Sequence, residues 1–274
     1  MGVFFHKFIL YFILLLFALL YLVPFFFLLT GSFKTTSELF QVPFRWFPEK
    51  FTFENYGNMF SQIPFFLYLR NTLIIVLFSV AGALLSNSLI AYGFSRLRWP
   101  GRDKVFMIVL ATMILPYQVT LIPLYLMFTK MHWVGTFLPL IVPQFFGNAF
   151  YIFLLRQFLV GVPKEITESA RIDGANEFRI FLQVIMPISK PALASVSIMA
   201  FIRAWNDFLG PLVFLGSDKL YTLSLAASML KSNLDPNWDL LLPLGVVMVM
   251  PVLILFFVLQ KYFIQGITMS GIKG

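Results

Sequence analysis

Polar side chains inside the apolar stretches of this chain are of the types that bind small molecules. Gln144, Asn148 and Tyr151 are spaced four and three residues apart, so on one helix they would form a single stripe. Such a stripe either joins neighbouring helices by hydrogen bonds or lines a polar path between them. Gln118, in the preceding apolar stretch, is a further candidate for that path.

A second polar group surrounds Trp205. Arg203 and Asp207 are four residues apart, so on a helix they share one face and predict an ion pair that fixes packing. Alternatively, Trp205, Asn206 and Asp207 border a solute path. An aromatic face stacks on C–H surfaces, and amides and carboxylates hydrogen-bond hydroxyls, so such a wall suits sugars.

Several kinds of chemistry are excluded by what the chain lacks. Cysteine is absent, which excludes disulfides, zinc–thiolate sites, iron–sulfur clusters and thiol catalysis. The two histidines, His6 and His132, lie far apart and outside the apolar stretches, so neither a metal site nor a proton relay is expected. No G-x-x-x-x-G-K-[ST] sequence occurs, so the chain does not hydrolyse ATP itself. We therefore expect no catalytic residue and no bound metal.

The elements that carry these residues are predicted to be membrane helices. The chain is 59% hydrophobic and only 12% charged, whereas a soluble domain carries about 25% charged residues. Six stretches reach the ~20 apolar residues that a spanning helix needs, and we expect an all-α protein with a single membrane domain over residues 1–274. The predicted spans are 8–29, 69–94, 105–128, 137–159, 192–214 and 241–263. The first is too long for a signal peptide and is interpreted as an uncleaved span.

The basic residues predict the orientation of the spans. With the N-terminus inside, the cytoplasmic segments hold twelve Lys and Arg residues and the outer segments hold seven. Because cytoplasmic loops carry the excess of positive charge, both termini are predicted to be cytoplasmic. The same rule accounts for the net charge of +8, so nucleic acid is not an expected partner.

Proline occurs repeatedly within the predicted spans. Proline removes a backbone hydrogen bond and kinks a helix, and neighbouring helices or a cavity can satisfy the freed groups. The prolines are either ordinary membrane-helix prolines or marks of a bundle that rearranges around an internal path. They are Pro116, Pro123, Pro143, Pro211, Pro243 and Pro251.

One charged stretch, residues 162–191 (hereafter the polar segment), lies between the fourth and fifth predicted spans and faces the cytoplasm in this orientation. It holds four of the twelve acidic residues of the chain. A short amphipathic helix over 164–172, a turn at Asp173-Gly174 and a second helix over 175–184 are predicted, with Pro187 and Pro191 closing the segment. The segment is either a solvated amphipathic loop or a surface for a soluble partner.

The residues of the polar segment resemble the EAA motif of ABC-importer permeases. Glu168-Ser169-Ala170, Asp173-Gly174-Ala175, Phe181, Ile185 and Pro187 match the motif, with Ser169 in place of Ala and Met186 in place of Leu. In that family this helix–turn–helix docks into a cleft of the ATP-binding subunit. The resemblance implies that Glu168 contacts the ATPase, that Ala170 and Gly174 permit close docking, and that Asp173 holds the turn.

Further sequences resemble the carbohydrate permeases within this family, above all the shorter, six-span membrane subunit of the maltose transporter. They are Ser32-Phe33-Lys34, Phe51-Thr52-Phe53-Glu54-Asn55-Tyr56, Ala91-Tyr92-Gly93-Phe94-Ser95-Arg96, Phe153-Leu154-Leu155-Arg156-Gln157-Phe158 and Ala204-Trp205-Asn206-Asp207-Phe208. The resemblance implies a type I ABC importer permease fold, a carbohydrate substrate and a location in the prokaryotic plasma (inner) membrane.

The resemblance also implies partners. They are a second, different permease subunit, two copies of an ATP-binding subunit that holds ATP and Mg²⁺, and an extracytoplasmic solute-binding protein; this chain itself is expected to hold no cofactor. Two other functions remain as alternatives. A stand-alone secondary transporter or channel would use ionisable groups near the midplane, for which only Arg203 and Asp207 are candidates. An intramembrane enzyme would find no paired carboxylates in the spans.

Overall fold

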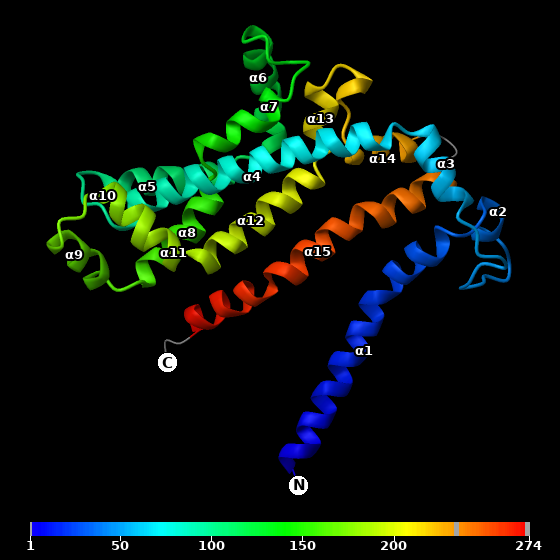
Figure 1. Cartoon of the computed structure of the whole chain (residues 1–274), viewed down its shortest axis with the longest axis horizontal. Helices are drawn as coiled ribbons and strands as arrows, with labels where there is room; N and C mark the ends of the chain where they lie inside the picture. The colour runs from blue at the N-terminus through cyan, green and yellow to red at the C-terminus, as the bar shows by residue number, and fades with distance from the viewer. Residues whose placement is uncertain (1, 233–235, 272–274) are drawn as a thin grey trace. The chain divides into compact units, whose positions relative to one another are not determined.

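The computed structural model describes residues 2–232 and 236–271, and both stretches are helical without a strand. The chain divides into two compact units (Figure 1). Unit 1 comprises Met1–Phe65 and Ala226–Pro251, and unit 2 comprises Phe66–Leu225 and Val252–Gly274. Each unit therefore combines segments that lie far apart in the sequence.

Unit 1 is built around two long apolar helices. It contains α1 (Gly2–Gly31), α2 (Thr36–Leu39), α3 (Glu54–Gln62) and the first part of α15 (Trp238–Gly271). A Cβ added at Gly31 would lie 3.1 Å from Leu242, and one added at Gly245 would lie 3.1 Å from Leu28. Glycine therefore lets α1 and α15 approach closely, as small residues do between membrane helices.

The residues that follow α1 explain two of the motifs quoted above. Asn55 donates from Nδ2 to the carbonyls of Ser32 (3.1 Å) and Lys34 (2.8 Å), so α3 is tied to the turn after α1. Lys34 is only 1% exposed; its Nζ donates to the Arg45 carbonyl and lies 4.8 Å from the centre of the Phe44 ring. These contacts give the Ser32-Phe33-Lys34 motif and the motif that contains Asn55 a structural role.

Unit 2 carries the polar segment and most of the predicted path residues. Its first half contains α4 (Phe65–Ser95), which begins at the unit boundary, α5 (Arg102–Ala111), η1 (Thr112–Ile114), α6 (Tyr117–Lys130), α7 (Leu138–Ile141), η2 (Val142–Phe146) and α8 (Ala149–Gly161). Its second half contains α9 (Glu165–Ile172), α10 (Glu177–Ile180), the π-helical turn η3 (Phe181–Ile185), α11 (Met186–Ile188), α12 (Lys190–Trp205), α13 (Leu209–Phe214), η4 (Asp218–Leu220) and the start of α14 (Leu223–Ser232).

The core of unit 2 joins the polar segment to the membrane helices. Ile180 of α10 is fully buried, as is Val196 of α12, and both belong to one cluster with Tyr92 of α4 and Leu155 of α8. Lipid is as apolar as these side chains, so the cluster stabilises the unit mainly by close packing. The short helix α10 therefore packs in the same core as α4, α8 and α12.

The number of candidate spans agrees with the sequence-based prediction only if bent helices are counted. Four stretches are long and apolar enough to cross a membrane as they stand: Phe5–Gly31, Phe65–Ser95, Leu138–Gly161 and Trp238–Gln260. Two further helix pairs, bent by 98° and 79°, bring the number to six if each is one span. The fold class is thus an all-α membrane protein with four to six candidate spans.

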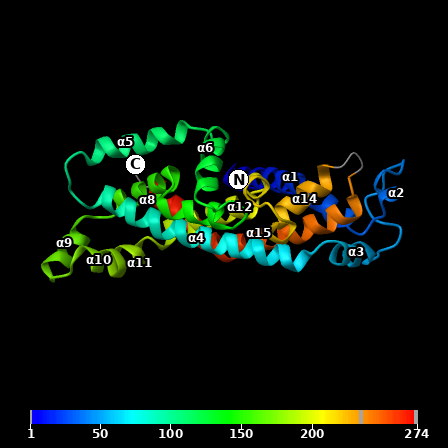
Figure 2. The same cartoon turned by 90° about the horizontal axis from the view of Figure 1, so that it is seen from above.

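The third predicted span, 105–128, is not one straight helix. It divides into α5 with η1 and α6, which meet at 98° (Figure 2). Leu115 has ψ 116° and Pro116 has ψ 138°, so both are extended. A residue before proline is disfavoured in the α conformation, which explains why the helix breaks here.

The fourth and fifth predicted spans, 137–159 and 192–214, are also interrupted. Gly147 has φ +94° between η2 and α8, a conformation that favours glycine. In the fifth, α12 ends at Trp205 and α13 begins at Leu209. The 16 residues of α12 measure about 24 Å, and the apolar stretch extends backwards through the 79° bend to Glu177 instead.

Candidate functional site

A cavity of about 300 Å³ in unit 2 lies where three of these helices are interrupted. Its walls come from α4, α6, the α7–η2 segment, α8, α12 and the residues that follow α12. Its polar lining residues are Thr72, Ser79, Tyr117, Gln144, Tyr151, Arg203, Asp207 and Thr222. The cavity therefore offers hydroxyl, amide, carboxylate and guanidinium groups among apolar walls, a combination typical of small-molecule sites.

Three of the predicted path residues meet in this cavity: Gln144, Tyr151 and Asp207. The Asp207 carboxylate accepts a hydrogen bond from the Gly210 backbone N–H at 3.0 Å, which fixes its position in the turn after α12. Tyr151 and Arg203 both line this cavity, whereas the sequence pointed to Arg203 as an ion-pair partner of Asp207 and not as a path residue.

The other predicted path residues are placed differently. Trp205 is 1% exposed and stacks on Phe201 with ring centres 5.5 Å apart, so it is not part of the cavity wall. Asn206 is exposed and donates back to the Ile202 carbonyl at 2.9 Å. Gln118 is exposed on α6. These three side chains do not line the cavity.

The two predicted spacings do not produce the expected contacts. Gln144, Asn148 and Tyr151 are not one helical stripe, because Gly147 separates η2 from α8. Asn148 instead caps α8, accepting hydrogen bonds from the backbone N–H groups of Phe150 and Tyr151. Arg203 and Asp207 form no ion pair within 4 Å, since α12 ends between them and Asp207 turns towards Gly210.

Buried polar residues of α4 position this site, although the sequence pattern did not single them out. Asn71 donates to the carbonyls of Lys219 (2.9 Å) and Tyr221 (3.0 Å), and the Thr72 hydroxyl accepts from the Leu223 backbone N–H (3.0 Å). Asn87, fully buried, accepts the Asn148 backbone N–H at 2.6 Å. The sequence did contain a signal for these residues. Burying a polar side chain in an apolar helix costs free energy unless the side chain forms hydrogen bonds, and α4 contains several such side chains.

Replacing Asn87 by alanine should lower stability. The Asn148 backbone N–H would lose its partner in a buried place, which costs about 1–3 kcal/mol. A lower midpoint of thermal unfolding in detergent is the expected result. Asn206→Ala is the matched control, because Asn206 is exposed and bonds only within its own helix; an equal shift in both variants would contradict the assigned role.

The polar segment forms two helices joined by a tight turn, as predicted. Gly174 has φ +82°, and its N–H donates to the Arg171 carbonyl, while the Ala175 N–H donates to the Ala170 carbonyl, both at 3.0 Å. The second helix begins at Glu177 rather than at Ala175. Asn176 caps it by accepting the Arg179 N–H at 2.8 Å, a start signal that the prediction passed over.

The motif residues divide into an outer and an inner set. Glu168, Ser169, Asp173, Gly174 and Pro187 are exposed. Ala170 and Ala175 are partly buried and pack against the core of unit 2. The Asp173 carboxylate accepts no hydrogen bond within the described residues, so the backbone bonds and the Asn176 cap hold the turn.

The apolar patch is the name used here for the large apolar side chains that the polar segment leaves exposed, which the sequence did not point to. It comprises Ile166 (38% exposed), Ile172 (87%), Phe178 (64%) and Leu182 (47%). Exposed large apolar side chains on a charged segment are candidates for contact with another protein. In the sequence, Ile166 and Ile172 lie among the charged residues Glu165, Glu168 and Arg171, and this pattern could have pointed to them.

A polar link connects this segment to α4. Glu177 of α10 accepts hydrogen bonds from Arg171 of α9 (2.7 Å) and from the Tyr92 hydroxyl of α4. The hydrogen bond with Glu177 raises the pKa of Arg171 above its ordinary value. Both views show α9, α10 and α11 together at one end of unit 2, near the C-terminal end of α4 (Figure 1, Figure 2). The Tyr92–Glu177–Arg171 link thus ties both short helices to a membrane helix.

Comparison with known proteins identifies this arrangement. Residues 79–269 match the family described as the binding-protein-dependent transport system inner membrane component. The chain belongs to this family. It is accordingly a multi-pass inner-membrane transport permease, and the matched region includes the polar segment, the Tyr92–Glu177–Arg171 link and all cavity residues except Thr72 and Ile75.

Relatives of this permease match along nearly its whole length. It is 36% identical to the arabinooligosaccharides transport system permease AraQ of Bacillus subtilis, over 94% of this chain and 92% of the relative. It is 30% identical to the lactose transport system permease LacG of Rhizobium radiobacter, over 93% of each chain.

A solved structure shares the fold of this permease. A chain of a bacterial ABC transporter that imports the acidic polysaccharide alginate superposes with a TM-score of 0.83, at 25% identity, covering 94% of this chain and 96% of that chain. The expected type I ABC importer permease fold is thereby confirmed.

Proposed function

We propose that this permease is a transmembrane subunit of an ATP-driven ABC importer for a carbohydrate. The carbohydrate assignment rests on the relatives. They match over nearly their full length and are named for the transport of arabinooligosaccharides and lactose. The cavity fits this substrate class, because Gln144, Tyr151 and Asp207 bring together an amide, a phenol and a carboxylate that can bond hydroxyl groups.

The exposed half of the polar segment supports coupling to an ATPase. Glu168 and Ser169 lie on α9, and Asp173 and Gly174 form the turn that follows it, so all four are close in the chain to Ile172 and Phe178, which a soluble subunit can bury. ATP is bound by that subunit with Mg²⁺. Closure of two such subunits pulls on α9 and α10, and the core around Ile180 passes this movement to the membrane helices as rigid-body motion.

The transporter also requires partners that supply the rest of the path. We propose a different permease subunit as the second half, two ATPase copies, and an extracytoplasmic binding protein that delivers the sugar. The family description, which makes transport dependent on a binding protein, supports the last of these.

Reconstitution tests this function directly. The chain, its partner permease and the ATPase are placed in proteoliposomes with the binding protein, and uptake of a labelled oligosaccharide is measured with and without ATP. Uptake that requires both ATP and the binding protein is expected. Uptake driven by an ion gradient through this chain alone would overturn the proposal in favour of a secondary transporter.

Substitution of Tyr151 tests the solute path. Tyr151→Phe removes one hydroxyl that lies within the cavity, and losing one hydrogen bond of about 0.5–1.5 kcal/mol lowers uptake efficiency roughly two- to tenfold. Uptake rates over a range of sugar concentrations provide the measurement. Tyr11→Phe is the matched control, because Tyr11 is 68% exposed on α1. Unchanged uptake in the Tyr151 variant would mean that the partner permease supplies the solute contacts.

A further inference from the structure

A hollow lined by basic side chains lies beyond the end of α4, outside the solute path. A cavity of about 630 Å³ separates residues 95–102 from α9 and from Glu177, and a neighbouring one of about 450 Å³ surrounds the start of α5. The two share Arg98, Trp99, Arg102 and Lys164. We call these two cavities together the basic hollow.

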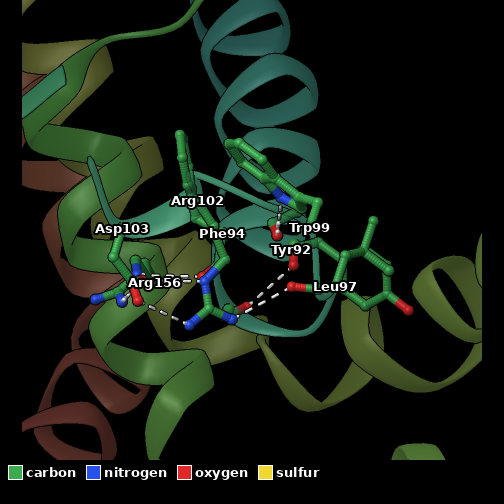
Figure 3. A network of polar contacts seen from close by, with 9 residues as sticks. Tyr92, Phe94, Leu97, Trp99, Arg102, Asp103 and Arg156 are labelled. Carbon is green, nitrogen blue, oxygen red and sulfur yellow. Dashed lines mark hydrogen bonds and ion pairs between the residues drawn. The ribbon is translucent and has the colours of Figure 1, made fainter. Parts of the chain in front are cut away.

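The charges of the basic hollow are unbalanced. Six basic side chains line it, against the three carboxylates of Asp103, Glu168 and Glu177. Arg102 pairs with Asp103 at 3.1 Å, and Arg156 reaches the same carboxylate at 3.7 Å (Figure 3). The Glu177 carboxylate forms an ion pair with Arg171 at 2.7 Å. The basic residues are Arg96, Arg98, Arg102, Lys104, Lys164 and Arg171.

Four of these cations have no carboxylate partner within the described residues: Arg96, Arg98, Lys104 and Lys164. Arg96 is the buried one, at 9% exposure. Its guanidinium donates to the carbonyls of Leu159 (2.7 Å) and Val162 (2.8 Å), but its Nε is buried without a partner. Burial lowers the pKa of Arg96. A buried cation without a counter-ion is costly, so an anion in the hollow would stabilise this end of the unit.

The position of the hollow favours a lipid as the source of that anion. It begins where the candidate span α4 ends, on the predicted cytoplasmic side. Trp99 is 39% exposed, packs against Phe94 and donates its ring N–H to the Gly93 carbonyl at 3.3 Å. Tryptophan is enriched at membrane–water boundaries, and basic pockets beside spanning helices bind anionic head groups.

We propose that the basic hollow binds the phosphate group of an anionic phospholipid of the cytoplasmic leaflet. Arg98 and Lys164 contact the phosphate, and Trp99 contacts the lipid at the membrane boundary. Lys164 directly precedes α9, so the bound lipid steadies the polar segment against the end of α4. The composition of the membrane thereby affects the helices that carry the apolar patch.

Native mass spectrometry of the full chain, with equal phosphatidylglycerol and phosphatidylcholine in the detergent, tests this site. The wild type should retain phosphatidylglycerol selectively, and Arg98→Gln with Lys164→Gln should weaken retention on the order of tenfold to thirtyfold. Lys130→Gln with Lys219→Gln removes two exposed charges elsewhere and is the matched control. Equal retention by the two double variants would overturn the proposal.

Two further measurements identify the source of the anion. Phosphatidylglycerol with brominated acyl chains should quench a larger fraction of the tryptophan fluorescence in the wild type than in Trp99→Phe. The difference should exceed the one that follows from having one tryptophan fewer. Inorganic phosphate should not displace the lipid more than chloride at the same ionic strength; displacement by phosphate would assign a soluble anion instead. Loss of ATPase copurification in the Arg98/Lys164 variant, with lipid binding unchanged, would assign the hollow to a protein partner and overturn the lipid site.

Discussion

Uptake is expected to fall below detection when Gly174 is replaced by valine, while the chain stays in the membrane. Gly174 has φ +82° between α9 and α10, and the left-handed conformation costs an L-residue about 1–2 kcal/mol, more for a β-branched one. The turn must then open, which moves Glu168 and the apolar patch out of register with an ATPase cleft. Transport assays and copurification of the ATPase subunit measure both consequences.

Two substitutions separate backbone strain from direct contact at this turn. Gly174→Asn adds a side chain that tolerates the left-handed conformation, so it should retain most uptake if strain alone is the cause. Gly57→Val places the same side chain on α3, where nothing lies within 4 Å of the added Cβ and φ is ordinary. Normal uptake and normal ATPase copurification in Gly174→Val would refute the coupling role of the polar segment.

Replacing Glu177 by alanine should uncouple ATP hydrolysis from transport. Glu177 joins α9 and α10 to α4 through Arg171 and Tyr92, and its removal leaves the four side chains of the apolar patch in place. The ATPase should therefore still bind and hydrolyse ATP, while uptake per ATP falls at least tenfold. Hydrolysis and uptake measured in the same proteoliposomes give this ratio.

The two bonds of Glu177 should contribute unequally. The Arg171–Glu177 pair is 38% and 44% exposed, and an exposed ion pair contributes only about 0.2–1 kcal/mol. Tyr92 is 4% exposed, and Tyr92→Phe removes its hydrogen bond to the Glu177 carboxylate; a hydrogen bond to a charged group contributes about 1.5–3 kcal/mol. Arg171→Ala should therefore have a small effect, and Tyr92→Phe an intermediate one.

A matched control for this link is available in unit 1. Glu49→Ala breaks the exposed Arg45–Glu49 pair, which is spaced four residues apart in the sequence and lies outside the polar segment. It should leave the ratio of uptake to hydrolysis unchanged. An unchanged ratio in Glu177→Ala itself would show that α10 moves the membrane helices through the apolar core alone.

The predicted residues differ in how well their surroundings could be anticipated. The turn at Asp173-Gly174 is a local property of two residues, and the structure has it where the sequence places it. The stripe of Gln144, Asn148 and Tyr151 failed because it assumed an unbroken helix, and a single glycine at 147 with φ +94° rotates its two halves apart. Trp205 does not line the cavity, because it stacks on Phe201, and periodicity does not report packing of that kind.

Composition and local pattern alone determined that this chain is an all-α membrane protein, that residues 162–191 form two short helices, and which family it belongs to. These features depend on apolar length, charge and turn residues, which act over a few neighbouring positions. Only the tertiary structure decided which polar residues meet. Tyr92 and Glu177, or Asn87 and Asn148, come together because helices far apart in sequence pack side by side. Pairings of that kind follow from packing and are not encoded in the spacing of either residue alone.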